Sequence, residues 1–131
     1  MKVAVDTNVM VRAVVRDDRA QAEIAARLLR NSSLLVVALS VLCELVWVLR
    51  RVYGFKAAEV ADTIRSLTSA DNVEMNRAAV EAGLAMLDAG GDFADGVIAY
   101  EGRWLGAETF VSFDKKAVEM LKANGIAART L

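Results

Sequence analysis

Short apolar runs alternate with segments of helical periodicity along the whole of this 131-residue chain. The apolar runs are predicted strands, because they are short, rich in valine and leucine, and bounded by turn residues. The segments between them carry apolar residues at the three- and four-residue spacing of amphipathic helices. A chain that alternates strands with helices usually packs its helices on a parallel sheet. We therefore predict an α/β fold, a three-layer α/β/α sandwich with a mainly parallel central sheet.

The pattern also predicts where the elements begin and end. Strands are expected at residues 2–5, 34–38, 72–75, 109–112 and 126–129. Helices are expected at residues 8–16, 19–30, 40–53, 56–67, 77–88, 92–105 and 115–123. Ser40 is the expected N-cap of the third helix. The chain contains no proline-rich linker, repeat or low-complexity tract, so residues 1–131 are expected to form a single domain.

The absence of two residue types limits the chemistry that this chain can perform. It has no histidine, and Cys43 is its only cysteine. This excludes serine–histidine and cysteine–histidine catalysis, histidine-ligated zinc and structural disulfides. Catalysis would have to use carboxylates, hydroxyls, lysine, arginine or a bound metal ion. The formal net charge of −1 gives no overall signal for nucleic acid.

Hydrophobic residues make up 56% of the chain, which raises the question of a membrane protein. The longest stretch without a charge, residues 31–43, is interrupted by polar residues and is too short to span a bilayer. No signal peptide is recognisable at the amino terminus. We expect a cytoplasmic protein with no membrane contact, whose apolar residues fill a buried parallel sheet and contribute to an oligomer face.

Two acidic residues follow predicted strands directly. Asp6 comes after the first strand, and Asp114 follows the strand at 109–112. Because the carboxyl ends of parallel strands meet at one edge of a sheet, where ligand sites form, both are candidate ligands. Each could equally be the N-cap of the helix that follows it.

Glu44 is the only charged residue in the otherwise apolar segment 41–49. We expect this helix to be buried on nearly all sides, which would place the carboxylate in a poorly hydrated environment. A cation or an arginine would then be needed to compensate its charge. The alternative is a position at the rim of the helix, exposed to water.

Asp92 and Asp95 are three residues apart at the start of a predicted helix, so they point in similar directions. Gly90 and Gly91 allow a tight turn before them. Helix capping is a strong alternative for Asp92, because it occupies the expected N-cap position. The same explanation is weaker for Asp95, which lies inside the first turn.

Taken together, these acids predict a carboxylate site for a divalent cation. Oxygen ligands without histidine or thiolate favour Mg²⁺ or Mn²⁺. Such an ion activates water and stabilises charge on a phosphate, which suits phosphodiester hydrolysis. The candidate catalytic residues are Asp6, Glu44, Asp95 and Asp114, with Asp92 as a further metal ligand. Thr7, Asn8 and Ser112 are candidates to orient these carboxylates.

The ordered set of acidic segments resembles the PIN domain, and within it the VapC-like toxin ribonucleases of toxin–antitoxin pairs. The matching segments are residues 5–9, 44–49, 92–99 and 111–114. The resemblance implies a PIN fold, Mg²⁺- or Mn²⁺-dependent endoribonuclease activity, a homodimer and a VapB-like antitoxin partner, through which alone operator DNA would be contacted. It implies Asp6, Glu44 and Asp95 as the core metal ligands, with Asp114 as a fourth ligand and Asp92 as an auxiliary one.

Three features depart from the usual pattern of that family. Ser112 stands where threonine is frequent, no proline precedes the helix that carries Glu44, and Gly96 replaces a usual alanine. None of these changes removes a ligand. Seven basic residues are candidates to contact RNA phosphates, although each could be an ordinary solvated residue: Arg12, Arg16, Arg50, Arg51, Arg103, Lys115 and Lys116.

Two other functions remain open at the level of sequence. One is a receiver-like signalling domain that binds Mg²⁺, but such domains usually carry an acidic pair where this chain has Asp6-Thr7-Asn8. The other is a PIN-like nucleic-acid-binding or interaction module without catalysis, against which the complete set of acids argues.

Overall fold

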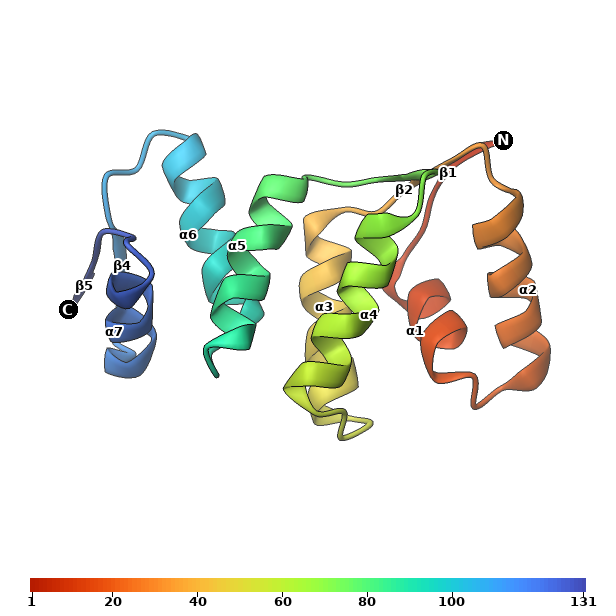
Figure 1. Ribbon diagram of the computed structural model, residues 1–131, viewed down its shortest axis with the longest axis horizontal. Coiled ribbons are helices and arrows are strands. Elements are labelled where there is room, and N and C mark those ends of the chain that lie inside the picture. The colour runs from red at the N-terminus through yellow and green to blue at the C-terminus, as the bar shows by residue number, and fades with distance from the viewer. The chain divides into compact units, whose positions relative to one another are not determined.

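The computed structural model describes residues 1–131 and has an α/β fold with parallel strands, as predicted (Figure 1). Every predicted strand and helix is present, with ends displaced by a few residues at most. The strands are β1 Lys2–Ala4, β2 Leu34–Val36, β3 Val73–Glu74, β4 Phe110–Ser112 and β5 Ala128–Thr130. The helices are α1 Thr7–Val15, α2 Arg19–Asn31, α3 Leu39–Arg51, α4 Ala57–Ser69, α5 Arg77–Asp88, α6 Phe93–Trp104 and α7 Lys115–Ala123.

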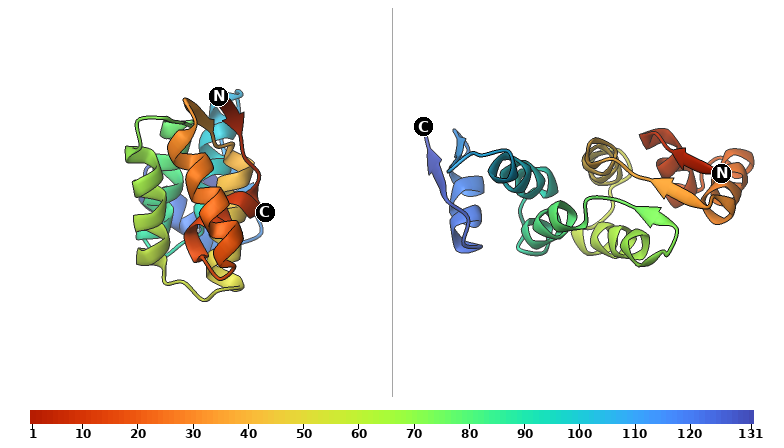
Figure 2. Two further views of the ribbon diagram at one scale, coloured as in Figure 1. Left: turned by 90° about the vertical axis from the view of Figure 1, so that its right-hand side faces the viewer. Right: turned by 90° about the horizontal axis from the view of Figure 1, so that it is seen from above.

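The chain forms two compact units, Met1–Asn76 and Arg77–Leu131, which are described separately. The first unit contains a parallel sheet in the order β1–β2–β3, whose strands lie side by side in Figure 2. Lys2 pairs with Leu34, and Leu35 pairs with Val73. In parallel strands the chain must cross over between neighbours, and here two helices make each crossover. The strands β1 and β2 therefore end at the same edge, where α1 and α3 begin.

The core of the first unit is made by one apolar stripe from each helix and by the central strand. Leu35 of β2 and Val37, which directly follows this strand, are almost fully buried. The largest helix residues of this core are also fully buried: Met10, Leu42, Leu45, Leu49, Val60 and Ile64. Burying a side chain of this size contributes about 1.5–3 kcal/mol. The first unit therefore has a substantial core of its own.

The second unit consists of α5 and α6, followed by the strand–helix–strand segment β4–α7–β5. Its two strands are parallel, with Phe110 opposite Ala128. The core joins all three helices and β5 through Met86, Ala99, Val118, Leu121 and Ala128, against which Phe110 packs. These contacts hold the end of β4, and the residues that follow it, at the start of α7.

Helix α3 begins differently from the prediction. Its N-cap is Ala38, which offers no side chain for capping, and Ser40 lies inside the first turn. The predicted capping role of Ser40 is therefore wrong. Serine is tolerated both at the N-cap and in the first turn of a helix. The helix begins at the half-buried Leu39, one residue earlier than predicted.

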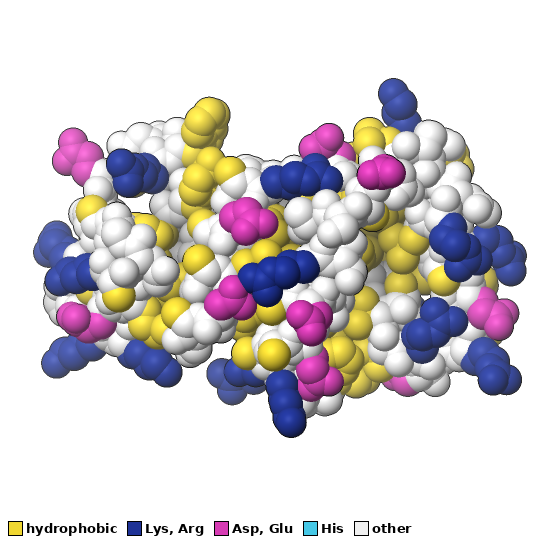
Figure 3. Space-filling view, viewed as in Figure 1, with side chains coloured by type: hydrophobic (Ala, Val, Ile, Leu, Met, Phe, Trp, Pro, Cys, Tyr) yellow, Lys and Arg dark blue, Asp and Glu magenta, His cyan; other side chains and the backbone are white.

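No helix combines the length and apolar character needed to cross a membrane. Lysine, arginine, aspartate and glutamate side chains are distributed over the face shown in Figure 3, with hydrophobic side chains visible between them. Charged surface of both signs agrees with the near balance of acidic and basic residues in the sequence.

Candidate functional site

Asp6 follows β1 at the carboxyl edge of the first unit's sheet, as the sequence predicts. It is exposed, and its Oδ1 accepts a hydrogen bond from the backbone N–H of Val9 at 3.0 Å. Asp6 is thus the N-cap of α1, but capping uses only one carboxylate oxygen. The second oxygen has no protein hydrogen-bond partner and is available to a ligand. The cap also holds the Asp6 backbone in a fixed position, because the first turn of α1 is tied to it.

Glu44 lies in the second turn of α3, and the prediction that it is buried is wrong. The helix buries one stripe, formed by Leu42, Leu45, Val46 and Leu49. Glu44 lies on the opposite, exposed face, where the Trp47 side chain is also 59% exposed. Apolar residues occur on both faces of α3, but only one face is buried, so the apolar pattern overestimates how much of this helix is buried. Burial therefore gives Glu44 no need for a compensating cation.

Asp92 and Asp95 lie at the start of α6 in the second unit. Asp92 is the N-cap, and its Oδ1 accepts the backbone N–H of Ala94 at 3.0 Å. Asp95 lies in the first turn, is partly buried, and forms no hydrogen bond or salt bridge with the protein. This agrees with the sequence, in which capping is a strong explanation for Asp92 and a weaker one for Asp95.

Asp114 follows β4 and caps α7, with its Oδ1 accepting the backbone N–H of Ala117 at 3.1 Å. The Ser112 hydroxyl accepts the backbone N–H of Asp114 at 3.0 Å. Ser112 therefore fixes the backbone of Asp114, whereas the prediction had this hydroxyl oriented toward a carboxylate. Thr7 and Asn8 were predicted to orient the carboxylates, but neither side chain forms a hydrogen bond to one of them.

The acids of the second unit influence one another electrostatically. Burial, followed by the negative charges of Asp92 and Asp114, raises the pKa of Asp95 above the ordinary value of an aspartate. No basic side chain compensates this charge. A carboxylate with raised pKa beside two further carboxylates is an environment that a bound cation would stabilise.

The predicted ligands are distributed over both units. Asp6 and Glu44 belong to the first unit, and Asp92, Asp95 and Asp114 belong to the second. No group of three or more acidic or cysteine side chains is arranged in the structure to hold a metal ion. The chemistry of the donors, carboxylate oxygens alone, nevertheless fits Mg²⁺ or Mn²⁺.

Gly96, which replaces the usual alanine of the resembling family, has a packing role. A Cβ atom added to it would lie 2.3 Å from the carbonyl oxygen of Ala82 on α5. On the facing helix, a Cβ added to Gly83 would lie 2.7 Å from the ring of Phe93. These two glycines let α5 and α6 approach closely. This contact fixes the turn of α6 that carries Asp95.

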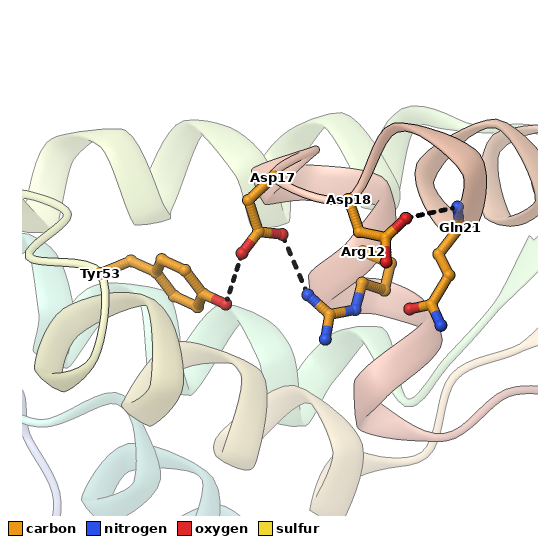
Figure 4. Close-up of polar contacts among 5 residues, drawn as sticks. All are labelled: Arg12, Asp17, Asp18, Gln21 and Tyr53. Atoms are coloured by element: carbon orange, nitrogen blue, oxygen red, sulfur yellow. Dashed lines mark hydrogen bonds and ion pairs between the residues drawn. The ribbon is translucent and has the colours of Figure 1, made fainter.

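Sequence reasoning did not single out Asp17 and Tyr53, which form a polar network in the first unit (Figure 4). Arg12 Nη1 donates to Asp17 Oδ1 at 3.0 Å, and the Tyr53 hydroxyl donates to Asp17 Oδ2 at 3.2 Å. Desolvation favours a higher pKa for Asp17, but the hydrogen bonds from Tyr53 and Arg12 and the arginine charge outweigh it, so the pKa is lowered. Tyr53 is 36 residues from Asp17, so no local pattern could reveal the contact.

Comparison with protein families identifies one match. The profile of the PIN domain matches residues 3–122, nearly the whole chain and all the acidic residues discussed above. A comparison with curated proteins found no match.

Proposed function

This chain belongs to the PIN domain family, and from that premise we propose that it is a metal-dependent endoribonuclease that acts as the toxin of a toxin–antitoxin pair. PIN domains are typically metal-dependent ribonucleases, and they generally use divalent metal ions. Membership in this family leaves the receiver-like alternative without support.

The observation that carries the proposal is the electrostatic environment of Asp95. Its pKa is raised by burial and by two neighbouring acids, and no protein cation offsets the charge. The negative charges of Asp92 and Asp114, without a counter-charge, oppose ionisation of Asp95. Arrangements of this kind are frequent at functional sites, where a ligand supplies the missing charge.

We assign Asp6, Glu44, Asp95 and Asp114 as metal ligands, with Asp92 as an auxiliary ligand. Mg²⁺ or Mn²⁺ bound by these residues would supply an activated water and stabilise charge on the scissile phosphate. Asp6 and Asp114 each direct one oxygen into a helix cap, which leaves the other for this role. Asp95 forms no bond within the protein, so both of its oxygens remain for a ligand or for accepting a proton from the attacking water.

The biological role is a finer proposal that rests on the resemblance to VapC-like toxins. It includes a VapB-like antitoxin, a homodimer, operator DNA contacted only through the antitoxin, and a cytoplasmic location. Exposed large apolar residues, among them Trp104 at 79% and Leu105 at 78%, are compatible with a protein partner.

Cleavage of total cellular RNA by the purified protein tests the proposal. We expect discrete fragments with Mn²⁺ or Mg²⁺, none with EDTA, and none with Asp95→Asn. Loss of even an outer residue of a metal site commonly costs about 10- to 100-fold in activity, so loss of a ligand should cost at least about 100-fold.

Circular dichroism and gel filtration of Asp95→Asn serve as controls for folding. Unchanged cleavage by the folded variant would refute the assignment of Asp95. Absence of cleavage by wild-type protein that is free of antitoxin and binds Mn²⁺ would instead support a non-catalytic PIN module. Protein that neither binds metal nor cleaves RNA would refute the carboxylate site itself.

A further inference from the structure

A group of unpaired arginines lies around the polar network of the first unit. Arg16 and Arg19 flank Asp17 and Asp18 in the connection from α1 to α2, and Arg51 is the last residue of α3. The hydrogen bond between Tyr53 and Asp17 joins these two parts of the chain (Figure 4). Arg16, Arg19 and Arg51 are all exposed, and none forms a hydrogen bond or salt bridge through its side chain. We call these three residues the arginine patch.

The acids beside the arginine patch in sequence, Asp17 and Asp18, accept their hydrogen bonds from other residues of the first unit. Both carboxylate oxygens of Asp17 are occupied, one by Arg12 and the other by Tyr53. Asp18 directs its Oδ1 to the backbone N–H of Gln21 at 3.1 Å, as the N-cap of α2. Neither carboxylate forms a hydrogen bond or salt bridge with Arg16, Arg19 or Arg51, although both remain negatively charged. The three guanidinium groups are therefore left for an anionic partner.

The backbone of Arg16 is a second and independent observation. Arg16 caps α1 with φ of 59° and is the only residue other than glycine with positive φ. This left-handed conformation favours glycine, and a long side chain at such a position is uncommon. A residue kept in a disfavoured conformation often has a role in binding. The strain points to a function for the Arg16 side chain.

We propose that the arginine patch binds backbone phosphates of the RNA strand, on one side of the scissile bond. The inference rests on the proposed ribonuclease function and adds a substrate-binding surface to it. Arg16 lies ten residues from Asp6, about 15 Å along α1, so it contacts a phosphate other than the reacting one. Guanidinium groups suit this role because they pair with phosphate through two parallel hydrogen bonds.

The test measures RNA binding without cleavage. Asp95→Asn protein is titrated, in EDTA, into a short fluorescein-labelled single-stranded oligoribonucleotide of mixed sequence at several salt concentrations. Each lost phosphate contact lowers the slope of log affinity against log salt by about 0.7. In this background, Arg16→Gly and Arg51→Gln should each show that change and weaken binding roughly fivefold at 0.1 M salt, and the double variant should show the sum.

The matched control is Arg30→Gln, which removes the same charge from the other end of α2. Arg30 is exposed and lies eleven residues from Arg19, about 16 Å along the helix. It should change neither the slope nor the affinity. Arg16→Gly should also melt at the same or a higher temperature than its parent, because glycine relieves the positive φ. Weaker RNA binding by a protein that is no less stable excludes a merely structural role.

The cleavage-competent protein provides the second readout. The Arg16→Gly and Arg51→Gln changes should raise KM for RNA and leave kcat unchanged, because they remove binding that is equal in the ground and transition states. Slopes and KM equal to those of Arg30→Gln would overturn the patch while leaving the ribonuclease function intact. A wild-type protein that neither binds nor cleaves RNA would refute the proposed function and the patch together.

Discussion

At the scale of single residues, each acid carries two roles that compete for the same oxygens. Asp6, Asp92 and Asp114 are N-caps, and each uses one carboxylate oxygen for a backbone N–H. Capping of this kind contributes roughly 1 kcal/mol and fixes the residue at the helix start. Asp95 has no such role, and its charge is uncompensated. It is therefore the residue whose ionisation matters most for the stability of the metal-free protein.

We predict that Asp95→Asn raises the thermal stability of the metal-free protein at neutral pH. The folded-state pKa of Asp95 is raised above its unfolded value, so ionised Asp95 opposes folding. That cost is absent below the unfolded pKa, and it appears as the pH rises through the folded pKa. The advantage of Asp95→Asn in Tm should thus shrink as the pH falls and vanish in acid. Melting curves in EDTA over a pH series measure it, and an advantage that does not change with pH would contradict the electrostatic explanation.

At the scale of elements, the close contact of α5 and α6 determines how the start of α6 is held. The two helices touch through backbone at Gly83 and Gly96, next to Asp95. Helix α6 offers a second glycine, Gly102, for comparison. A Cβ at Gly102 would meet only Ala107 Cβ, at an ordinary distance of 3.9 Å. Replacing Gly96 and Gly102 in turn by alanine therefore distinguishes the effect of packing against α5 from the effect of helix propensity.

We predict opposite effects of alanine at the two glycines. Gly96→Ala should destabilise the protein by about 1–3 kcal/mol, because the new methyl group overlaps the backbone of α5. Gly102→Ala should stabilise it by about 0.5–1 kcal/mol, because alanine favours the helix and the site has room. Urea denaturation measures both, and equal effects at the two sites would show that Gly96 is not packed against α5.

At the scale of the whole molecule, the acids proposed as ligands come from both compact units. A ligand that binds only the folded chain stabilises it in proportion to the logarithm of its concentration. The prediction that residues 1–131 form one domain also concerns the whole chain. A single domain is expected to unfold in one cooperative transition. The contacts within either unit do not determine whether the two units unfold together.

Mg²⁺ should raise the Tm of the wild-type protein more than that of Asp95→Asn. At a free concentration 100 times the dissociation constant, the expected gain is about 2.7 kcal/mol. Thermal melts against Mg²⁺ concentration measure the effect, with NaCl at equal ionic strength as the control for screening. Equal shifts for the two proteins would argue against Asp95 as a ligand.

Calorimetry tests the single-domain prediction. If residues 1–131 unfold as one cooperative domain, a single transition is expected, with calorimetric and van't Hoff enthalpies that agree. Two separable transitions would indicate that Met1–Asn76 and Arg77–Leu131 unfold independently. The Gly96→Ala variant distinguishes the two outcomes. If the chain unfolds in one transition, the variant should shift that transition; if it unfolds in two, the variant should shift only one of them.

Much of the fold could be read from local pattern. Apolar periodicity and turn residues predict all the strands and helices, because these depend on neighbours a few residues away. The capping positions of Asp6, Asp92 and Asp114 were foreseen as alternatives for the same reason. The ordered acidic segments also indicated the PIN family, which the match over residues 3–122 confirms.

Tertiary structure decided the features that depend on which face an element buries and on what lies opposite. Glu44 is exposed because α3 packs only one of its two apolar faces, and the surrounding elements determine which face is buried. The fit of Gly96 against Ala82 depends on a facing helix. The bond of Tyr53 to Asp17 joins residues far apart in sequence. The sequence by itself determined the elements and the family, whereas burial, helix contact and charge environment arise only when distant segments pack together.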